Sequence, residues 1–176
     1  MELGEELVVL VDEEGRPIGH APKRTVHTTH TPLHLAFSCH VRDGAGRILV
    51  TRRALGKRTW PGVWTNSFCG HPAPGEDVTQ AVVRRGRQEL GIDLEDLELA
   101  LPDFRYRAVD ASGIVEHELC PVYVARVRGD VSPDPDEVVE WKWVDEAALT
   151  AAVESAGWAF SPWLALQLTE LAARQR

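Results

Sequence analysis

The sequence predicts an α/β (α+β) sandwich, in which a mixed sheet lies between helices, formed by a single domain over residues 1–176. Short apolar runs separated by turn residues predict strands along most of the chain. Segments with helical periodicity, each preceded by a capping residue, lie among these strands. A chain of 176 residues, of which 44% are hydrophobic, can bury a core of its own.

The first half of the chain is predicted to consist mainly of strands. The segment 33–42 alternates, so the face that carries His34 also carries Ala36, Ser38 and His40. A polar segment at 22–32 precedes it, and a hairpin turn at 43–47 follows it. The strands predicted here cover 6–11, a short segment after the turn at 12–19, 33–42, 48–53 and 64–68.

The second half is predicted to add three helices and three strands. A cap at Asp77 or Thr79 begins a helix that ends at Leu90, and Asp145 caps a second helix. The dipeptide at 161–162 begins a last helix that runs to residue 176. Strands are expected at 102–110, 114–127 and 139–144, and the second of these is the longest in the chain. The segment 92–101 is predicted to be a polar connection, and 128–137 an exposed acidic loop.

Composition excludes several classes of protein. A formal net charge of −8 argues against nucleic acid as a partner. No apolar run approaches the roughly 20 residues that cross a bilayer, so no membrane partner is expected. The acidic start of the chain lacks the basic residues of a signal peptide, and three cysteines make no disulfide framework, which together predict a cytoplasmic protein.

The stretch 64–92 brings together unusual chemistry. In this stretch a predicted strand is followed by a Gly- and Pro-rich loop, which holds Cys69 and His71. A predicted helix comes after the loop. At about 100° per residue, Glu89 lies close to the apolar stripe of that helix and therefore points inward. An inward carboxylate must be paired or must hold a cation. Glu89 could simply pair with Arg85, or both could face a site for metal and phosphate.

Candidate metal ligands lie on other segments too. Glu116 and Glu118 share one face of a predicted strand, which is costly unless a cation holds them. Together with three histidines they would suit a divalent cation such as Mn²⁺, Zn²⁺ or Mg²⁺; the histidines are His27, His34 and His71. A lone histidine is more often structural, and a free cysteine such as Cys69 is more often a small buried residue.

The stretch around the helix resembles the Nudix box. Gly70, Glu76, Arg84, Glu89, Gly91 and Ile92 match that motif at the right spacing. Two acidic positions do not match, because they hold Arg85 and Gln88. Nudix hydrolases use those carboxylates to hold metals that activate water on a diphosphate. The resemblance therefore implies the Nudix fold with a different chemistry.

Longer motifs resemble the type I isopentenyl-diphosphate isomerases. The similar segments are TPLHLAFS, TRRALGKRTWPGVWTNSFCGHP, RRGRQELGI, FRYRAVDASGIVEHELCPV and WAFSPW, within residues 7–168. The resemblance implies a Nudix-like fold with additional N-terminal strands. It also implies the interconversion of isopentenyl and dimethylallyl diphosphate, through a tertiary carbocation, for isoprenoid biosynthesis. A monomer or homodimer that takes a small allylic or homoallylic diphosphate is expected.

Roles are carried over from this resemblance position by position. It implies metal ligands at His27, His34, His71, Glu116 and Glu118, and catalytic residues at Cys69, Glu118, Tyr106 and Trp163. It implies a Mg²⁺ that accompanies the diphosphate, near Glu89 and the carbonyl of Cys69. It implies diphosphate-binding residues at Lys23, Arg53, Lys57 and Arg85. One departure is Pro32, where many members have an arginine.

Two other functions stay open on the residues alone. A metal-dependent Nudix diphosphate hydrolase would release phosphate or a monophosphate, and the missing carboxylates count against it. A metal-binding domain without catalysis would leave Cys69 and Tyr106 without a role.

Overall fold

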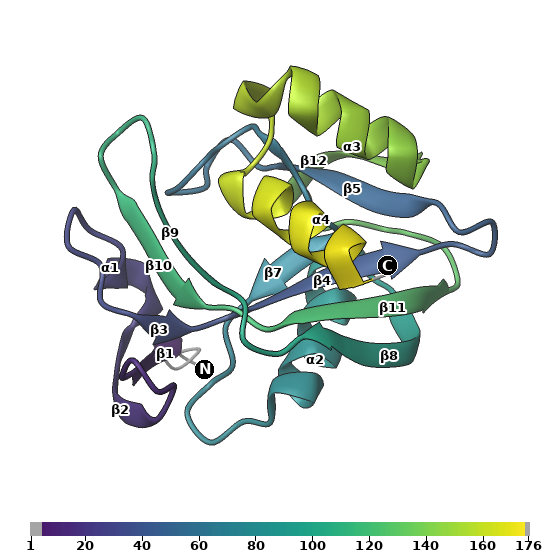
Figure 1. Ribbon diagram of the computed structural model, residues 1–176. Helices are drawn as coiled ribbons and strands as arrows, with labels where there is room; N and C mark the ends of the chain where they lie inside the picture. Colours follow the sequence, from purple (N-terminus) through teal and green to yellow (C-terminus); the bar gives the residue numbers. More distant parts are fainter. Residues whose placement is uncertain (1–4, 175–176) are drawn as a thin grey trace.

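The computed structural model describes residues 5–174, whose strands form two sheets (Figure 1). The smaller sheet has the strand order β2–β1–β3–β10–β9. Its strands are β1 (Leu7–Val11), β2 (Pro17–Pro22), β3 (His34–Leu35), β9 (Arg105–Val109) and β10 (Val115–Leu119). These strands include the N-terminal pair expected beyond the Nudix core.

The larger, seven-stranded sheet is mixed, as predicted. Its order is β12–β5–β4–β11–β8, and β6 and β7 pair with β5 and β4. β4 runs parallel to β11 and antiparallel to β5. Its strands are β4 (Phe37–Arg42), β5 (Ile48–Arg53), β6 (Trp64–Thr65), β7 (Phe68–Gly70), β8 (Asp93–Leu101), β11 (Val122–Arg128) and β12 (Val138–Val144).

Helices cover both faces of the larger sheet, which confirms the predicted sandwich (Figure 1). One face packs on α2 (Val78–Leu90), where Leu49 shares a cluster with Val82. The other face packs on α3 (Glu146–Ser155) and α4 (Pro162–Arg174), where Ile48 shares a cluster with Leu164. Because successive side chains of β5 point to opposite faces of the sheet, this strand contributes to the core on both sides. Short turns of helix at α1 (Lys23–Val26) and η1 (Gly157–Ala159) complete the elements.

Two predicted strands are each divided between the two sheets, which corrects the expectation of continuous strands at 33–42 and 114–127. The first becomes β3 and β4, and the second becomes β10 and β11. The two segments run side by side, because Glu118 is the register partner of His34 and Val122 that of Ser38. The second break falls at Pro121, which has no N–H to donate to a ladder. Alternation continues through both breaks, so the sequence pattern did not reveal them.

The expected polar connection after α2 is wrong, because residues 93–101 form β8. This strand pairs only with β11 at the edge of the sheet. An edge strand can turn its charged side chains to solvent, which is why its composition is that of a loop. The predicted strand at 64–68 is likewise divided into β6 and β7, and Asn66 and Ser67 lie buried between them.

Helix boundaries follow the predicted caps. The carboxylate of Asp77 accepts a hydrogen bond from the backbone of Gln80, and that of Asp145 accepts from Ala147 and Ala148. The predicted last helix is present as α4, and residues 175–176 lie outside the described part of the chain. No helix within residues 5–174 is long and apolar enough to cross a membrane.

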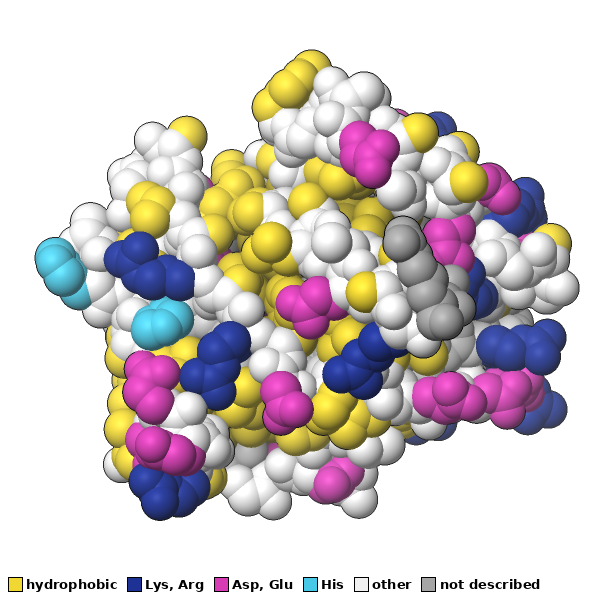
Figure 2. Space-filling view, viewed as in Figure 1, with side chains coloured by type: hydrophobic (Ala, Val, Ile, Leu, Met, Phe, Trp, Pro, Cys, Tyr) yellow, Lys and Arg dark blue, Asp and Glu magenta, His cyan; other side chains and the backbone are white. Residues whose placement is uncertain are grey.

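The face drawn in Figure 2 carries charged side chains of both signs, at its edge and across its lower half. Hydrophobic side chains gather near its centre, where β9 passes beside α4. Exposed apolar residues on these neighbouring elements include Val109 on β9 and Leu166 on α4. No broad basic surface is visible on this face.

Gly91 ends α2 in the left-handed conformation, with φ of 64°. A Cβ atom there would lie 2.9 Å from the carbonyl oxygen of Ser132. We expect Gly91→Ala to lower the free energy of unfolding by about 2 kcal/mol or more, through backbone strain and this contact. Urea denaturation would measure the loss.

Gly46→Ala is the matched control, because Gly46 has φ of 79° in open space. Its loss should be limited to the strain of about 1 kcal/mol. Equal losses in the two variants would show that Ser132 does not restrict the end of α2.

Candidate active site

A pocket of about 200 Å³ opens where the two sheets meet. β10 and β9 of the smaller sheet supply Glu116, Glu118 and Tyr106, and β7 of the larger sheet supplies Cys69. Except for His34, all the residues predicted for the site line this pocket: Lys23, His27, Arg53, Lys57, Cys69, His71, Arg85, Glu89, Tyr106, Glu116, Glu118 and Trp163. His34 is fully buried beside Glu118.

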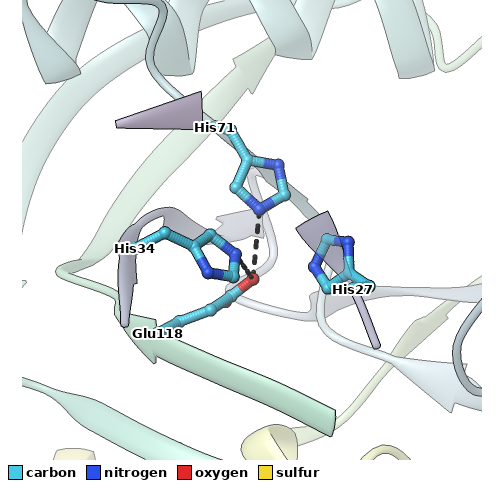
Figure 3. A group of neighbouring side chains, drawn as sticks. All are labelled: His27, His34, His71 and Glu118. Atoms are coloured by element: carbon cyan, nitrogen blue, oxygen red, sulfur yellow. Dashed lines mark hydrogen bonds and ion pairs between the residues drawn. The ribbon is translucent and has the colours of Figure 1, made fainter. Parts of the chain in front are cut away.

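Three histidines and one glutamate form a compact cluster (Figure 3). A ligand atom from each of His27, His34, His71 and Glu118 lies within 4.8 Å of the others. Glu118 Oε1 is 3.1 Å from His71 Nε2 and 3.5 Å from His34 Nε2. Glu116 extends the cluster, because its Oε2 atom is 3.1 Å from His27 Nε2.

The donor atoms of this cluster fit a divalent cation. The Nδ1 atom of His34 lies 2.9 Å from the carbonyl oxygen of Pro32, and donating its proton there leaves Nε2 with a lone pair toward the cluster. Buried atoms that lack a well-formed hydrogen bond within the described residues include His27 Nε2, Glu116 Oε2 and His34 Nε2, whose contact with Glu118 is 3.5 Å long. Such orphaned atoms around one point are costly unless an ion or water satisfies them. Imidazole and carboxylate ligands suit Zn²⁺ or Mn²⁺.

Burial and neighbouring groups move the pKa values in the cluster in different directions. Burial lowers the pKa of His71 to about 4. Burial and the nearby charge of Glu118 raise the pKa of Glu116. Burial alone would also raise the pKa of Glu118, but hydrogen bonds to His34 and His71 hold it well below its usual range. Glu118 is thus the ionised carboxylate of the pair, and His71 is neutral at pH 7, as a metal ligand must be.

Glu118 has a second partner on the neighbouring strand. Tyr106 is its register partner on β9, and its hydroxyl donates a hydrogen bond of 2.9 Å to Glu118 Oε2. Burial raises the pKa of Tyr106 well above its usual value, so the phenol stays a donor. One oxygen of Glu118 therefore faces the histidines, and the other is held by Tyr106.

The thiol of Cys69 lies between two polar side chains. Its Sγ atom donates to Asn66 Oδ1 at 3.3 Å and lies 3.3 Å from Ser38 Oγ. Burial raises the pKa of Cys69 to about 11, so this residue is a thiol at neutral pH. Asn66 Oδ1 also accepts a hydrogen bond of 3.0 Å from the indole of Trp163. No local pattern indicates this contact, since Asn66 and Trp163 are far apart in the chain.

Basic residues converge on the same pocket, but acidic partners hold several of them. Arg85 bonds Glu89, the pairing considered from the sequence, and also lies 3.3 Å from Glu137. Glu137 pairs with Lys57 as well. The predicted exposed acidic loop at 128–137 therefore ends in a pocket residue that the sequence did not identify.

Lys23 and Arg53 have different surroundings. Lys23 forms an ion pair of 2.7 Å with Glu6. Arg53 donates to the backbone carbonyls of Thr59 and Trp60, and its guanidinium lies 5.4 Å from the centre of the Trp163 ring. A cation over the Trp163 ring is thus a feature of the site itself.

The residues that match the Nudix box and the two that depart from it have different surroundings. Arg84 binds Glu76 through two hydrogen bonds of 2.8 Å, so this pair of motif residues closes the loop before α2. Gln88 is exposed, and Arg85 is buried beside Glu89. Glu89 is thus the one carboxylate that α2 contributes to the pocket, within the described residues.

Comparison with known proteins decides the family. The model of the NUDIX domain matches residues 32–164. The isopentenyl-diphosphate Delta-isomerase of Clavibacter michiganensis subsp. michiganensis is 66% identical over 163 residues, which are 93% of this chain and 84% of that protein. The chain belongs to the isopentenyl-diphosphate isomerase family of Nudix proteins. The isomerase of Leifsonia xyli subsp. xyli is 64% identical over 170 residues, 96% of this chain and 92% of that protein.

Solved structures support the Nudix fold. DR0079 from Deinococcus radiodurans superposes with a TM-score of 0.75 at 18% identity, over 94% of this chain and 99% of that one. A MutT protein from Methanosarcina mazei Go1 superposes with a TM-score of 0.65 at 18% identity, over 82% of this chain and 96% of that one. The fold prediction is thereby confirmed.

Thr59 offers a test of cation binding at the cluster. Its hydroxyl donates a hydrogen bond of 2.6 Å to Glu116 Oε1 and so orients that carboxylate. We expect Thr59→Val to weaken Mn²⁺ binding by about tenfold, as the loss of a group that orients a ligand does. Isothermal titration of the metal-free protein would measure the affinity.

Thr51→Val is the control, because the buried hydroxyl of Thr51 bonds only the backbone carbonyls of Asn66 and Ser67. Its Mn²⁺ affinity should equal that of the unmodified protein. Unchanged affinity in Thr59→Val would remove Glu116 from the cation site.

Proposed function

We propose that this protein is an isomerase that interconverts isopentenyl diphosphate and dimethylallyl diphosphate for isoprenoid biosynthesis. Its named relatives support this activity at 58–66% identity. The observation that carries the proposal is the composition of one pocket. A thiol at Cys69 and a carboxylate held by a phenol at Glu118 line it together with basic residues for a diphosphate.

The reaction requires an acid and a base in the same pocket. One carbon of the alkene gains a proton, another loses one, and the double bond moves by one position through a tertiary carbocation. Glu118 and Cys69 are the proposed pair that carries these protons. Tyr106 holds one oxygen of Glu118, and the Cys69 thiol is protonated at neutral pH. Each of the two groups therefore has a defined protonation state before the substrate binds.

The cluster of His27, His34, His71, Glu116 and Glu118 is the proposed site of one divalent cation, Mn²⁺, Zn²⁺ or Mg²⁺. Such a cation would tune which of the two carboxylates carries the proton. Glu89 and the carbonyl of Cys69 are the proposed contacts of a Mg²⁺ that accompanies the diphosphate. The buried Glu89 carboxylate faces the pocket, where burial raises its pKa, as expected of a group that a cation would stabilise.

The diphosphate is proposed to bind Lys23, Arg53, Lys57 and Arg85. In the free protein, Glu137 pairs with Lys57 and Arg85, and Glu6 pairs with Lys23. Phosphate oxygens can replace these carboxylates, because they accept the same charge-assisted hydrogen bonds. Substrate binding would thus exchange ion pairs rather than fill an unpaired basic surface.

We propose a cytoplasmic protein, monomeric or homodimeric, whose partner is a small allylic or homoallylic diphosphate. Water must leave the pocket before a carbocation forms. The segment 158–163 is one proposed cover, since Trp158 is 87% exposed while Trp163 is buried. The N-terminal segment is the other proposed cover, and its residues 1–4 lie outside the described part of the chain.

Proton NMR in D₂O tests the proposed reaction. The purified protein is mixed with isopentenyl diphosphate, Mg²⁺ and Mn²⁺. The exocyclic methylene signal of the substrate should then disappear while deuterium enters the allylic product. Cys69→Ala and Glu118→Gln should abolish this change, while thermal unfolding shows whether each variant remains folded. An unchanged spectrum with the metal-loaded protein would reject the isomerase.

Trp163 is proposed to offset the positive charge of the intermediate. A ring face contributes about 2 kcal/mol or more to a desolvated cation. Trp163→Ala should therefore lower kcat by more than tenfold, roughly the equivalent of 1.4 kcal/mol, and change KM less than kcat. Steady-state kinetics would measure both, and equal effects on kcat and KM would indicate packing alone.

Diphosphate hydrolysis is the alternative function, and the Nudix box allows a direct test. Gln88→Glu restores one missing carboxylate, but Arg85 still replaces the other. We expect this variant to release no monophosphate from nucleoside diphosphate derivatives, in a colorimetric phosphate assay with alkaline phosphatase added. Release by the unmodified protein would instead favour the hydrolase.

A further inference from the structure

A chain of buried polar side chains runs from the Cys69 thiol to helix α4. Gln167 lies on α4 one turn after Trp163, and both are buried. Trp163 bonds Asn66, which accepts the proton of the Cys69 thiol. Gln167 bonds Ser38, which contacts the same sulfur atom. The helix is therefore connected to Cys69 by two separate routes.

The hydrogen bonds of the Gln167 route run from His40 through Gln167 to Ser38. His40 Nε2 is 2.8 Å from Gln167 Oε1, and Gln167 Nε2 donates to Ser38 Oγ at 2.9 Å. Burial lowers the pKa of His40 to about 4, so the ring is neutral and can donate from Nε2. Ser38 Oγ accepts from Gln167, and its own proton can be donated to a sulfur atom. The acceptors within reach are the sulfur atoms of Cys69 at 3.3 Å and Cys120 at 3.4 Å.

These four side chains are an expensive arrangement for a core. Ser38, His40, Asn66 and Gln167 are each at most 1% exposed. An apolar set of the same volume would fill the space without the cost of desolvating polar groups. Such a network can fix the orientation of a neighbouring side chain.

We propose that Ser38 is a positioning residue for the Cys69 thiol, and that Gln167 acts through Ser38 by orienting its hydroxyl. The inference rests on the proposed role of Cys69 in the isomerase reaction. Asn66 and Ser38 hold the sulfur atom from two directions, so that it faces the pocket. Without Ser38, the thiol keeps only its bond to Asn66 and can rotate away from the reacting carbon.

The first test compares Ser38→Ala with Cys120→Ala, in steady-state isomerase kinetics with the metal-loaded protein. Ser38→Ala should lower kcat by about tenfold or more and leave KM unchanged, because small displacements of a reacting group lower the rate strongly. Cys120→Ala should keep both constants, since it removes the other sulfur atom beside Ser38 and leaves Cys69 in contact. Unchanged kcat in Ser38→Ala, or an equal loss in Cys120→Ala, would overturn the proposal.

The second test is a double-mutant cycle with Gln167→Met. If Gln167 acts through Ser38, the double variant should have the kcat of Ser38→Ala alone. If the double variant lost kcat by the product of the two single-variant factors, the route through Ser38 would be overturned. Thermal unfolding and bound metal, measured on each variant, separate a loss of folding from a loss of positioning. Failure of the unmodified protein to isomerise would reject the proposed function instead.

Discussion

The burial of Glu116 and Glu118 on one face of β10 is the constraint on which the site depends. Two carboxylates away from water are unfavourable unless hydrogen bonds or cations compensate them. Every neighbouring element contributes to that compensation. Tyr106 on β9, His34 on β3, and His71 after β7 bond Glu118, while Thr59 and His27 contact Glu116. The position of the pocket follows from where these elements meet.

Two continuous segments connect the sheets and make that meeting point rigid. The chain passes from β3 into β4 and from β10 into β11, and the segments are parallel neighbours in both sheets. His34, Glu116 and Glu118 are thus held by backbone ladders, while His27 follows α1 and His71 follows β7. Cys69 lies on a strand of the larger sheet, beside β4. The thiol and Glu118 are therefore held by different sheets, whose mutual placement the two crossings determine.

Local features were predictable from the sequence, and long-range ones were not. Caps at Asp77 and Asp145 depend on neighbouring residues, so the helix boundaries followed directly. The breaks within 33–42 and 114–127 depend on which strand lies alongside. Periodicity indicated Glu89, Glu116 and Glu118 as candidates, whereas the roles of the site residues came from a family resemblance. Glu137 and Asn66 acquire their roles through partners far along the chain, Lys57 and Trp163, and no local pattern marks such contacts.

The pairing of His34 with Glu118 has a consequence for how the chain finds its register. The two residues are direct partners in a short parallel ladder between β3 and β10. Such a ladder has few backbone hydrogen bonds of its own, and its register is continuous with that of the longer ladder between β4 and β11. A slip of one residue would place His117 or Leu119 opposite His34 and turn Glu118 to the other face of the sheet. Only the native alignment assembles the cluster, so a divalent cation present during folding would select the correct register from its neighbours.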